Sequence, residues 1–278
     1  MYISLQVSHL NQVSFEPLEA TAIEGHLSPD VQRWVRELRI HQEIDSTNTH
    51  LVRRASTESI DGIICLAESQ TSGRGRRGRT WLTPTGQSIA ISLGQSLGVP
   101  VAEVGPLSLV VGIGVAVSLQ KMGVEGVRLK WPNDILLDGA KAGGILIELA
   151  GIGQPLAVVI GIGLNVGAGA EVRERLGIPI GDLQEKCQHI SRNELAAALI
   201  VNVHEQVVEF ERDGFAPLRS RWEKLHAHQH KPVLLLATNE TVEGIARGVS
   251  LSGELVIETS KGVSHFSSGE VSLRGSSK

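Results

Sequence analysis

The chain has 278 residues, 41% of them hydrophobic and 20% charged, so it can bury a substantial core and form one large domain or two smaller ones. Its formal net charge of −4 excludes a protein built as a whole to coat nucleic acid or an anionic membrane. The two cysteines, Cys65 and Cys187, fit unpaired thiols in a reducing compartment better than a disulfide framework. Because the N-terminal residues lack the basic start and apolar block of a secretory signal, we expect a cytoplasmic protein.

The first 40 residues contain one predicted helix, over residues 28–38. Ser28 can cap this helix and Pro29 suits its first position. Its apolar face would consist of Val31, Trp34, Val35 and Leu38. A helix-turn-helix module needs about three helices, so we expect no DNA-reading domain here. Residues 1–40 are therefore interpreted as an N-terminal extension of unknown function.

From residue 41 onward, short apolar runs alternate with glycine, proline and polar turns, which is typical of mixed α and β structure. The apolar stretch at 105–123 has an uncharged part shorter than the roughly 20 residues that span a bilayer, so we expect a buried core helix. Asp138 and Gly139 lie between two apolar runs and predict a hairpin, with Lys141 on the returning strand. Residues 155–167 predict another buried strand that ends in glycines.

The C-terminal part of the chain predicts a long helix followed by strands. Ser191 and Glu194 have the spacing of a capping box, and Gly214 ends the predicted helix. The apolar stripe of this helix would be Leu195, Leu199, Val203, Val207 and Phe210. Residues 231–274 predict short strands separated by turns at Thr238–Asn239, Ser252–Gly253 and Lys261–Gly262. We interpret them as a small β-barrel appended to the main domain.

Two motifs suggest functions that their context argues against. The segment GRGRRG at 73–78 matches the dinucleotide pattern G-x-G-x-x-G, but its arginines and the Pro84 that follows exclude the close packing of a strand-turn-helix site. An arginine-rich nucleic-acid segment is disfavoured because the basic run is a single insertion in an acidic chain. The histidines of HAHQH, at 226–230, suggest a metal site, but we expect a solvated linker where two domains join.

The arginine-rich segment has the composition of a loop that closes over a bound polyanion. Each guanidinium can donate a planar pair of hydrogen bonds to phosphate oxygens. The loop arginines are Arg74, Arg76, Arg77 and Arg79. Glycines at 73, 75 and 78 would let the backbone adopt positive φ, approach a ligand closely and stay mobile until one arrives.

A second group of polar residues lies downstream of this loop. The segment KWPND supplies Lys130, Asn133 and Asp134 around a turn fixed by proline, and Lys141 adds a cation beside Gly143 and Gly144. A flat ligand could lie against a strand that carries no side chains at these positions.

Five motifs, in order EIDSTN, GRGRRGR, KWPNDI, KAGGILIE and GIGLNV, with a C-terminal segment ending in GEVSLR, resemble biotin protein ligases. The resemblance covers roughly residues 41–278. It implies an α+β fold, with a mixed β-sheet and flanking helices like the class II aminoacyl-tRNA synthetase catalytic domain over residues 41–228. A small SH3-like β-barrel would follow over residues 231–278.

The resemblance also implies an activity. Members of the family join biotin to ATP, giving biotinyl-5′-AMP and pyrophosphate, and pass the biotinyl group to one lysine of a biotin carboxyl carrier protein, such as the acetyl-CoA carboxylase subunit. ATP and biotin would be substrates and Mg²⁺ a cofactor, with no metal ligand assigned in the protein.

The site residues follow from matching the motifs position by position. Biotin-binding residues would be Ser46, Thr47, Asn48, Gln70, Gly73, Arg74, Gly75, Arg76, Lys141, Gly144, Ile145, Leu146 and Gly161. Adenylate-binding residues would be Arg74, Arg76, Arg79, Lys130, Asn133, Asp134, Lys141 and Asn165. The catalytic residues would be Lys141 and Arg76, which offset charge on the phosphate, and Asp134, which orients or deprotonates the carrier lysine.

Alternatives exist for three of these positions. Asp134 could instead hold magnesium or fix its turn, and Ser46 or Thr47 could cap the helix that starts near Asn48. Ile180 takes the place of a tryptophan that some members stack on the adenine. Members that also act as transcriptional repressors carry a winged helix, which is not found here, so we expect no DNA binding. The net charge and the lack of an apolar stretch long enough to span a bilayer lead us to expect no membrane partner.

Members often pair through the sheet, so a homodimer is one expectation. A lipoate or octanoate ligase would share the fold and the adenylate chemistry. A biotin sensor or carrier-binding module without enzymatic activity is a further alternative, which Lys141 and the complete arginine loop disfavour.

Overall fold

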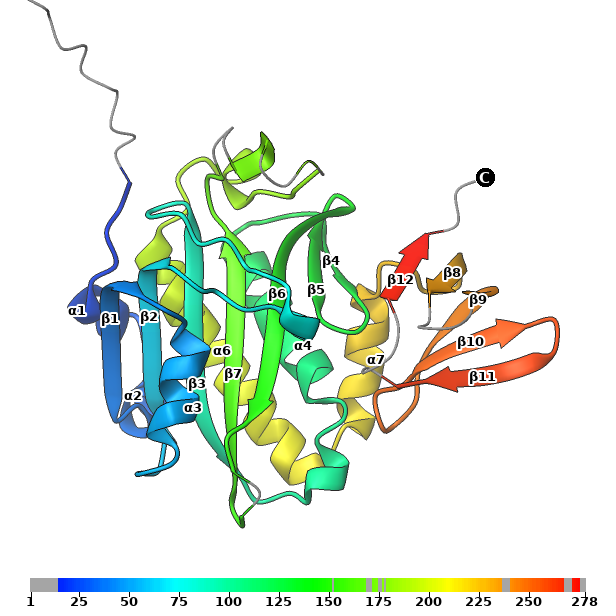
Figure 1. The fold of residues 1–278 in the computed structure, drawn as a ribbon, viewed down its shortest axis with the longest axis horizontal. Helices are drawn as coiled ribbons and strands as arrows, with labels where there is room; N and C mark the ends of the chain where they lie inside the picture. The colour runs from blue at the N-terminus through cyan, green and yellow to red at the C-terminus, as the bar shows by residue number, and fades with distance from the viewer. Residues whose placement is uncertain are drawn as a thin grey trace, which may run out of the picture.

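The computed structural model describes residues 15–151, 153–168, 172–174, 177, 179–236, 241–267 and 272–275, and these form two β-sheets with helices around the larger one (Figure 1). The large sheet contains β1 (Glu37–Ile44), β2 (Ile63–Gln70), β3 (Ser88–Leu97), β4 (Val127–Lys130), β5 (Asp134–Leu137), β6 (Ala140–Leu149) and β7 (Leu156–Asn165). The small sheet contains β8 (Pro232–Leu236), β9 (Thr241–Val249), β10 (Leu255–Thr259), β11 (Gly262–Phe266) and β12 (Ser272–Gly275).

The helices differ greatly in length. They are α1 (Ala20–Gly25), α2 (Pro29–Trp34), α3 (Thr47–Arg54), α4 (Leu107–Lys121), α6 (Arg192–Asp213) and α7 (Ala216–Leu225). Short 3-10 turns lie at η1 (Arg76–Gly78), η2 (Val101–Glu103) and η3 (Leu183–Glu185).

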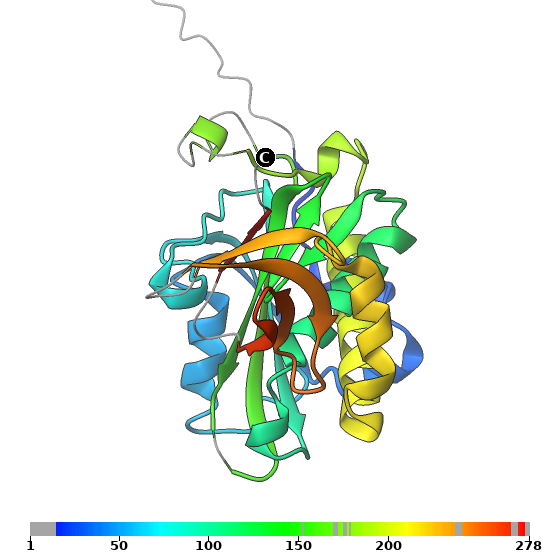
Figure 2. The same cartoon turned by 90° about the vertical axis from the view of Figure 1, so that its right-hand side faces the viewer.

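The large sheet is mixed, in the order β1-β2-β3-β7-β6-β5-β4. Strands β1 and β2 run parallel, whereas the other neighbours pair antiparallel. Helices α4 and α6 contact one face of the sheet and α3 contacts the other, as the side view in Figure 2 shows. The predicted mixed sheet with flanking helices is therefore confirmed.

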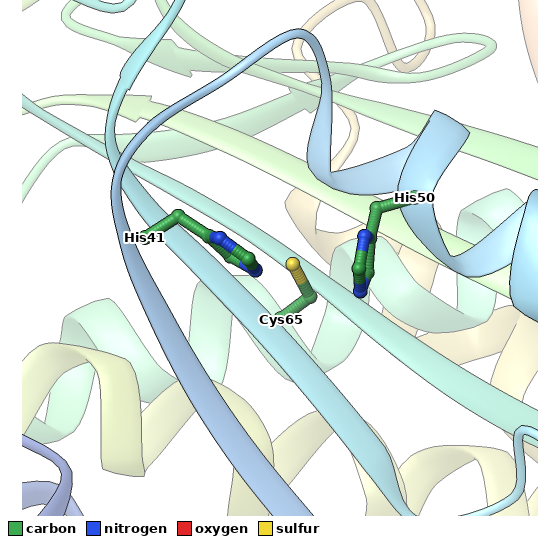
Figure 3. A group of neighbouring side chains, drawn as sticks. All are labelled: His41, His50 and Cys65. Carbon is green, nitrogen blue, oxygen red and sulfur yellow. The ribbon is translucent and has the colours of Figure 1, made fainter.

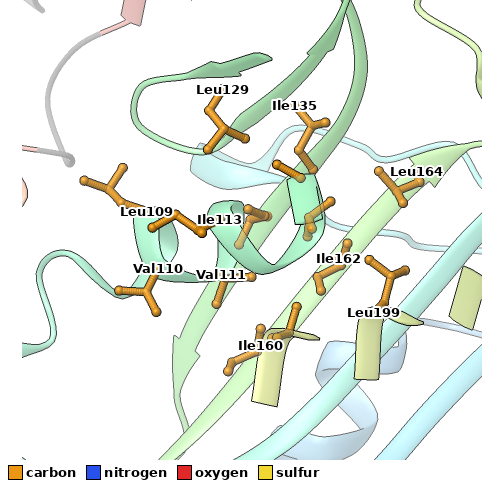
Figure 4. Close-up of a cluster of buried hydrophobic side chains, with 14 of the residues drawn as sticks. Leu109, Val110, Val111, Ile113, Leu129, Ile135, Ile160, Ile162, Leu164 and Leu199 are labelled. Atoms are coloured by element: carbon orange, nitrogen blue, oxygen red, sulfur yellow. The ribbon is translucent and has the colours of Figure 1, made fainter. Parts of the chain in front are cut away.

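Helix α4 forms the centre of the core. Side chains on all its sides are buried, because the helix is enclosed between the sheet and α6. Leu109, Val110, Val111 and Ile113 pack there with side chains of β4, β5, β7 and α6 (Figure 4). The predicted core helix is confirmed, and no helix of the described residues is long and apolar enough to cross a membrane.

Local sequence signals account for the other confirmed elements. Ser191 caps α6, accepting the amide of Glu194 at 3.2 Å, and Gly214 ends this helix with a φ of 72°. The β5–β6 hairpin turns at Asp138 and Gly139, whose φ angles of 48° and 84° are the left-handed conformation that such a two-residue turn requires. The apolar stripe predicted for α6 is buried, and both cysteines are free.

The helix predicted over residues 28–38 is wrong in its second half. Helix α2 ends at Trp34, and Leu38 lies in β1, which pairs with β2. Pairing with a neighbouring strand thus overrides the helical spacing of the apolar residues. A second helix, α1, precedes α2 although one helix was predicted, and residues 1–14 lie outside the described part of the chain.

The strands predicted for the C-terminal region are confirmed as an antiparallel sheet in the order β11-β10-β9-β8-β12. Gly253 takes a φ of 81° in the turn between β9 and β10, and Gly262 takes 117° after the turn that precedes β11. The expected turn at Thr238–Asn239 and residues 269–271 of GEVSLR lie outside the described residues.

The predicted solvated linker at HAHQH is wrong for its first histidine. His226 is 5% exposed, lies 4.6 Å from the ring of Trp222 and forms a β-bridge with Leu129. Burial lowers the pKa of His226 to about 4 and, likewise, the pKa of half-buried His228 to about 4. The segment packs because α7 and β4 meet here, which its polar composition did not reveal.

Candidate functional site

A cavity of about 640 Å³ opens on the face of the large sheet that α3 covers. Its size suits a small organic ligand of several rings or groups. It brings together most residues predicted for the site: Ser46, Thr47, Asn48, Gln70, Arg74, Gly75, Arg76, Arg79, Lys130, Asn133, Asp134, Lys141, Gly144, Ile145, Leu146, Gly161 and Asn165. Gly73 is the predicted residue that does not line it.

One end of the cavity is a buried polar network at the start of α3. The hydroxyl of Ser46 accepts the amide of Thr49 at 3.4 Å, so Ser46 caps the helix while it lines the cavity. Thr47 donates its amide to Oε1 of Gln70 at 2.9 Å. Ser92 Oγ, which the sequence did not indicate, lies 2.7 Å from Thr47 Oγ1. These polar groups are already held in fixed positions and can present donors and acceptors to a ligand.

Glu148 connects this polar end to the arginine loop. Its carboxylate accepts from Nδ2 of Asn48 at 2.9 Å and lies 3.1 Å from Nη2 of Arg74. Sequence reasoning missed Glu148. Its even spacing from Gly144 and Leu146 on β6 places it on the same face of the sheet, and this signal could have identified it.

The floor of the cavity is made of glycines, because side chains from opposite elements approach the strands there. A Cβ on Gly161 would lie 2.1 Å from Oδ1 of Asn48, and a Cβ on Gly163 would lie 2.5 Å from the indole of Trp81. Trp81 was missed by the sequence prediction. Its Nε1 is buried and has no hydrogen-bond partner within the described structure, so it is a donor that a ligand can satisfy.

Ile145 contributes to the cavity wall in a different way from its neighbours. Its side chain is 3% exposed and reaches toward Gly112 of α4, on the opposite face of the sheet. Successive residues of a strand face opposite sides, so Gly144 and Leu146 face the cavity. Ile145 contributes only its backbone atoms to the cavity wall.

The arginine loop follows β2, and backbone hydrogen bonds join its two sides. The amide of Gly75 donates to Arg79 O at 2.7 Å, and the amide of Trp81 donates to Gly73 O at 2.8 Å. The prediction of positive φ holds for Gly78, at 73°, and is wrong for Gly73 and Gly75. Arg77 takes a φ of 58° instead.

Gly73 is needed for a different reason. A Cβ there would lie 2.3 Å from the carbonyl oxygen of Trp81. Glycine therefore permits the close approach of the two ends of the loop, without a positive φ.

Positive charge gathers where the loop meets the β5–β6 hairpin. Arg76 donates to Oδ1 of Asn133 at 3.2 Å, and burial, followed by the charge of neighbouring Arg77, lowers the pKa of Arg76. Lys141 Nζ lies 2.5 Å from Oδ1 of Asp134 and 6.0 Å from the centre of the Trp81 ring. Such a concentration of cations beside a cavity suits an anionic group.

Asn133 fixes the turn that carries Asp134. Its Nδ2 donates to Ile145 O at 2.8 Å, and its backbone carbonyl accepts from the amide of Ile145. Asp134 is thus held beside Lys141 by the backbone of the neighbouring strand.

At the far end of the cavity, Asn165 Nδ2 donates to Gly181 O at 3.1 Å. Ile180, which lies in the wall, is 6% exposed and forms a β-bridge with Lys141. The segment around Ile180 therefore closes this end with an aliphatic side chain.

The fold and the cavity together define an α+β protein with a site for a ligand that has one polar and one anionic end. Residues 41–165 match the biotin/lipoate A/B protein ligase family, and residues 231–274 match the biotin protein ligase C terminal domain. The chain belongs to the biotin protein ligase family, which is a family of ligases.

Individual relatives agree with this assignment. The chain is 40% identical to the bifunctional ligase/repressor BirA of Escherichia coli, over 84% of this chain and 73% of that protein. It is 32% identical to the biotin--[acetyl-CoA-carboxylase] ligase of Mycobacterium tuberculosis, over 92% of this chain and 95% of that protein. The solved biotin protein ligase from Aquifex aeolicus in complex with biotin and ATP matches 87% of this chain and 100% of that one, with a TM-score of 0.75 and 28% identity.

Proposed function

We propose that the protein is an ATP-dependent biotin protein ligase, which activates biotin as biotinyl-5′-AMP and transfers it to one lysine of a biotin carboxyl carrier protein domain. The observation that carries this proposal is the single cavity that joins the buried polar network at α3 to the cationic group around Lys141. A substrate with a polar ring at one end and a carboxylate at the other fits a cavity that is polar at one end and cationic at the other.

The biotin end of the substrate would lie at α3. Thr47, Asn48 and Gln70 would meet the polar ring with hydrogen-bonding groups, and the glycine floor with Trp81 would hold the apolar remainder. The carboxylate would then point toward Lys141.

The first chemical step joins two anions. A carboxylate oxygen attacks the α-phosphorus, a new P–O bond forms, and the bond to the leaving pyrophosphate breaks. Lys141 and Arg76 would offset the repulsion and stabilise the charge that develops on the phosphate oxygens. Asp134 holds the ammonium of Lys141 in place for this task.

The second step forms the amide. The neutral amine of the carrier lysine attacks the acyl carbon, and AMP leaves with the electrons of the C–O bond. We assign to Asp134 the acceptance of the amine proton, because its carboxylate lies beside the same lysine that meets the reacting phosphate.

Magnesium would accompany the triphosphate. Mg²⁺ takes oxygen ligands and is often held by one or two carboxylates together with substrate phosphates. In the cavity wall, Asp134 supplies such a carboxylate beside Lys141, so it would hold the ion during the first step and accept a proton only in the second. When bound, the ion would offset the negative charge of the phosphates.

The C-terminal domain favours biotin over lipoate as the substrate. The family that matches residues 41–165 includes lipoate ligases by its description, whereas the family that matches residues 231–274 is described as a domain of biotin protein ligases. A homodimer, the lack of DNA binding, a cytoplasmic location and the domain boundaries at residues 41 and 231 stay predictions of the sequence.

The experiment is a transfer assay. The purified chain is incubated with ATP, magnesium, biotin and an apo carrier domain, and the carrier mass is measured. We expect the gain of one biotinyl group, and a decrease of about 10²- to 10³-fold in rate for Lys141→Ala and for Arg76→Ala. Lys261→Ala, in a turn of the small sheet, is the matched control.

Two outcomes would contradict the proposal. A mass gain with lipoate or octanoate but not with biotin would assign a different acyl substrate. Wild-type rates in both Lys141→Ala and Arg76→Ala would show that the cationic group has been assigned wrongly.

A further inference from the structure

Three potential metal ligands converge outside the cavity, between β1, β2 and α3. They are His41 on β1, His50 on α3 and Cys65 on β2, and one donor atom of each lies within 4.8 Å of the others. Figure 3 shows the sulfur of Cys65 between the two imidazole rings. None of the three lines the cavity described above.

Both imidazoles have a buried nitrogen with nothing to bind. Nε2 of His41 and Nε2 of His50 have no hydrogen-bond partner within the described part of the chain. Buried polar atoms are rarely left unsatisfied, so two such nitrogens beside one thiol are available to a shared ligand. Burial also lowers the pKa of both histidines, which keeps the imidazoles neutral with a lone pair available.

We propose that His41, His50 and Cys65 form a binding site for a zinc ion. Two imidazole nitrogens and one thiolate are the ligand types that Zn²⁺ prefers, whereas Mg²⁺ and Ca²⁺ prefer oxygen. Three protein ligands leave one position of a tetrahedral ion open for water. Tetrahedral zinc places its donors roughly 3.3–3.6 Å apart, so the side chains must close by at most about 1.5 Å from their present positions.

The charges around the group are already paired with one another. Arg54 binds Glu37 at 2.7 Å, and Arg39 lies 3.1 Å from the same carboxylate. Arg54 also binds Glu58 at 2.8 Å, so these two arginines and two glutamates carry no net charge, and the thiolate adds one negative charge.

Zinc binding must displace a proton from Cys65. Burial raises the pKa of this thiol to about 12, so the free thiol is protonated and its proton leaves to solvent as the Zn–S bond forms. Zinc affinity should therefore increase as the pH rises.

A bound ion would couple α3 to the sheet. His50 lies one turn after Thr47 and Asn48, which line the cavity, and β1 is an edge strand of the large sheet. Fastening His50 to β1 and β2 would hold this helix, and the polar residues at its start, against the strands.

The test uses Co²⁺ as a spectroscopic probe for zinc, with the full chain under reducing conditions. We expect one equivalent of Co²⁺ to produce thiolate-to-cobalt absorption, and one equivalent of Zn²⁺ to remove it. Cys65→Ala should abolish the absorption, and Cys187→Ala, which alters the other free thiol, should keep it. His50→Gln should weaken Co²⁺ binding by at least about tenfold.

Thermal unfolding in the absence of metal establishes that each variant is folded. With Zn²⁺ in excess, the melting temperature of the wild type and of Cys187→Ala should rise, and that of folded Cys65→Ala and His50→Gln should not. The proposal is overturned if the wild type gives no thiolate absorption, if the absorption persists in Cys65→Ala, or if it depends on Cys187.

Discussion

At the scale of single residues, Glu148 joins segments of the site that lie far apart in the sequence. Its carboxylate binds Asn48 of α3 and Arg74 of the arginine loop, and its side chain is 20% exposed. Glu148→Gln keeps an oxygen that can accept from Asn48 but removes the charge that holds Arg74. A hydrogen bond to a charged group contributes ~1.5–3 kcal/mol, and half-exposed Arg74 places this pair at the lower end, so we expect kcat/KM for biotin to fall by about tenfold.

Separate titrations of biotin and ATP measure this effect. The loss should appear mainly in KM for biotin, because both partners of Glu148 lie at that end of the cavity. Glu258→Gln is a matched control, since Glu258 also pairs with an arginine, Arg247, at 2.6 Å but in the small sheet. A loss confined to ATP, or equal losses in both variants, would contradict the assigned role.

The sequence identified the residues that belong to short motifs and missed those placed by the fold. Lys141 and Arg76 could be predicted because their neighbours in the chain form part of the same pattern. Trp81 and Ser92 could not, because their roles depend on contacts with distant elements. Trp81 lies against Gly163 of β7, and Ser92 of β3 contacts Thr47 of α3. Such contacts follow from strand register, which local patterns do not specify.

At the scale of elements, the start of α6 is anchored by a buried ion pair. Arg192 Nη2 lies 2.7 Å from Oε2 of Glu68, and both side chains are at most 3% exposed. Arg192 also donates to the carbonyls of Glu16 and Ser88, so it joins the N-terminal segment, β3 and α6. Removal of one partner would leave the charge of the other buried and unpaired.

We expect Arg192→Ala to lower the free energy of unfolding by ~3–5 kcal/mol, as is typical when a buried pair loses one member. Urea unfolding measures this change. The control is Arg33→Ala, because Arg33 and Asp30 form a pair whose side chains are 72% and 87% exposed, and such pairs contribute only ~0–1 kcal/mol. Similar effects in the two variants would show that the buried pair does not anchor α6.

Elements with their own start and stop signals in the sequence were predictable. Strand β1, which depends on pairing with β2, was not. Helix α6 has its capping serine and terminal glycine, and the β5–β6 hairpin has its Asp-Gly turn. The chain after Trp34 has a helical apolar pattern, yet the amides of Arg36 and Glu37 donate to Gly62 O and lead into β1. The competing strand β2 is 26 or more residues away in the sequence, so the local pattern could not reveal it.

At the scale of the whole molecule, the two sheets are joined by specific contacts rather than by the linker alone. Nε1 of Trp131, in the loop that carries Asp134, donates to Gly253 O of the small sheet at 3.0 Å. Glu223 of α7 accepts the amide of Val249 at 3.2 Å. The sequence predicted two units from their different patterns, but the contacts between them involve side chains with no distinctive motif.

Two histidines with lowered pKa make stability depend on pH. His226 lies between α7 and β4, and His204 stacks on Trp34 with ring centres 3.8 Å apart. Burial lowers the pKa of each to about 4 from an ordinary value of 6.5. The unfolded chain therefore binds more protons than the folded protein between these values, so stability is complete above about pH 6.5 and is lost as the pH falls toward 4.

Urea unfolding at about pH 7.5, 6 and 5 tests this dependence, because the free energy of unfolding should decrease at each step. His226→Gln retains a polar side chain that cannot take up a proton, so its stability should change less over this range, whereas exposed His26→Gln should follow the wild type. The range above about pH 5 is decisive because carboxylates with lowered pKa, such as those of Glu16 and Glu37, lose their contribution only at lower pH. A free energy of unfolding that is constant from pH 7.5 to 5 would contradict this prediction. It would mean that His226 can be protonated in the folded protein, and that burial of its ring does not limit stability in acid.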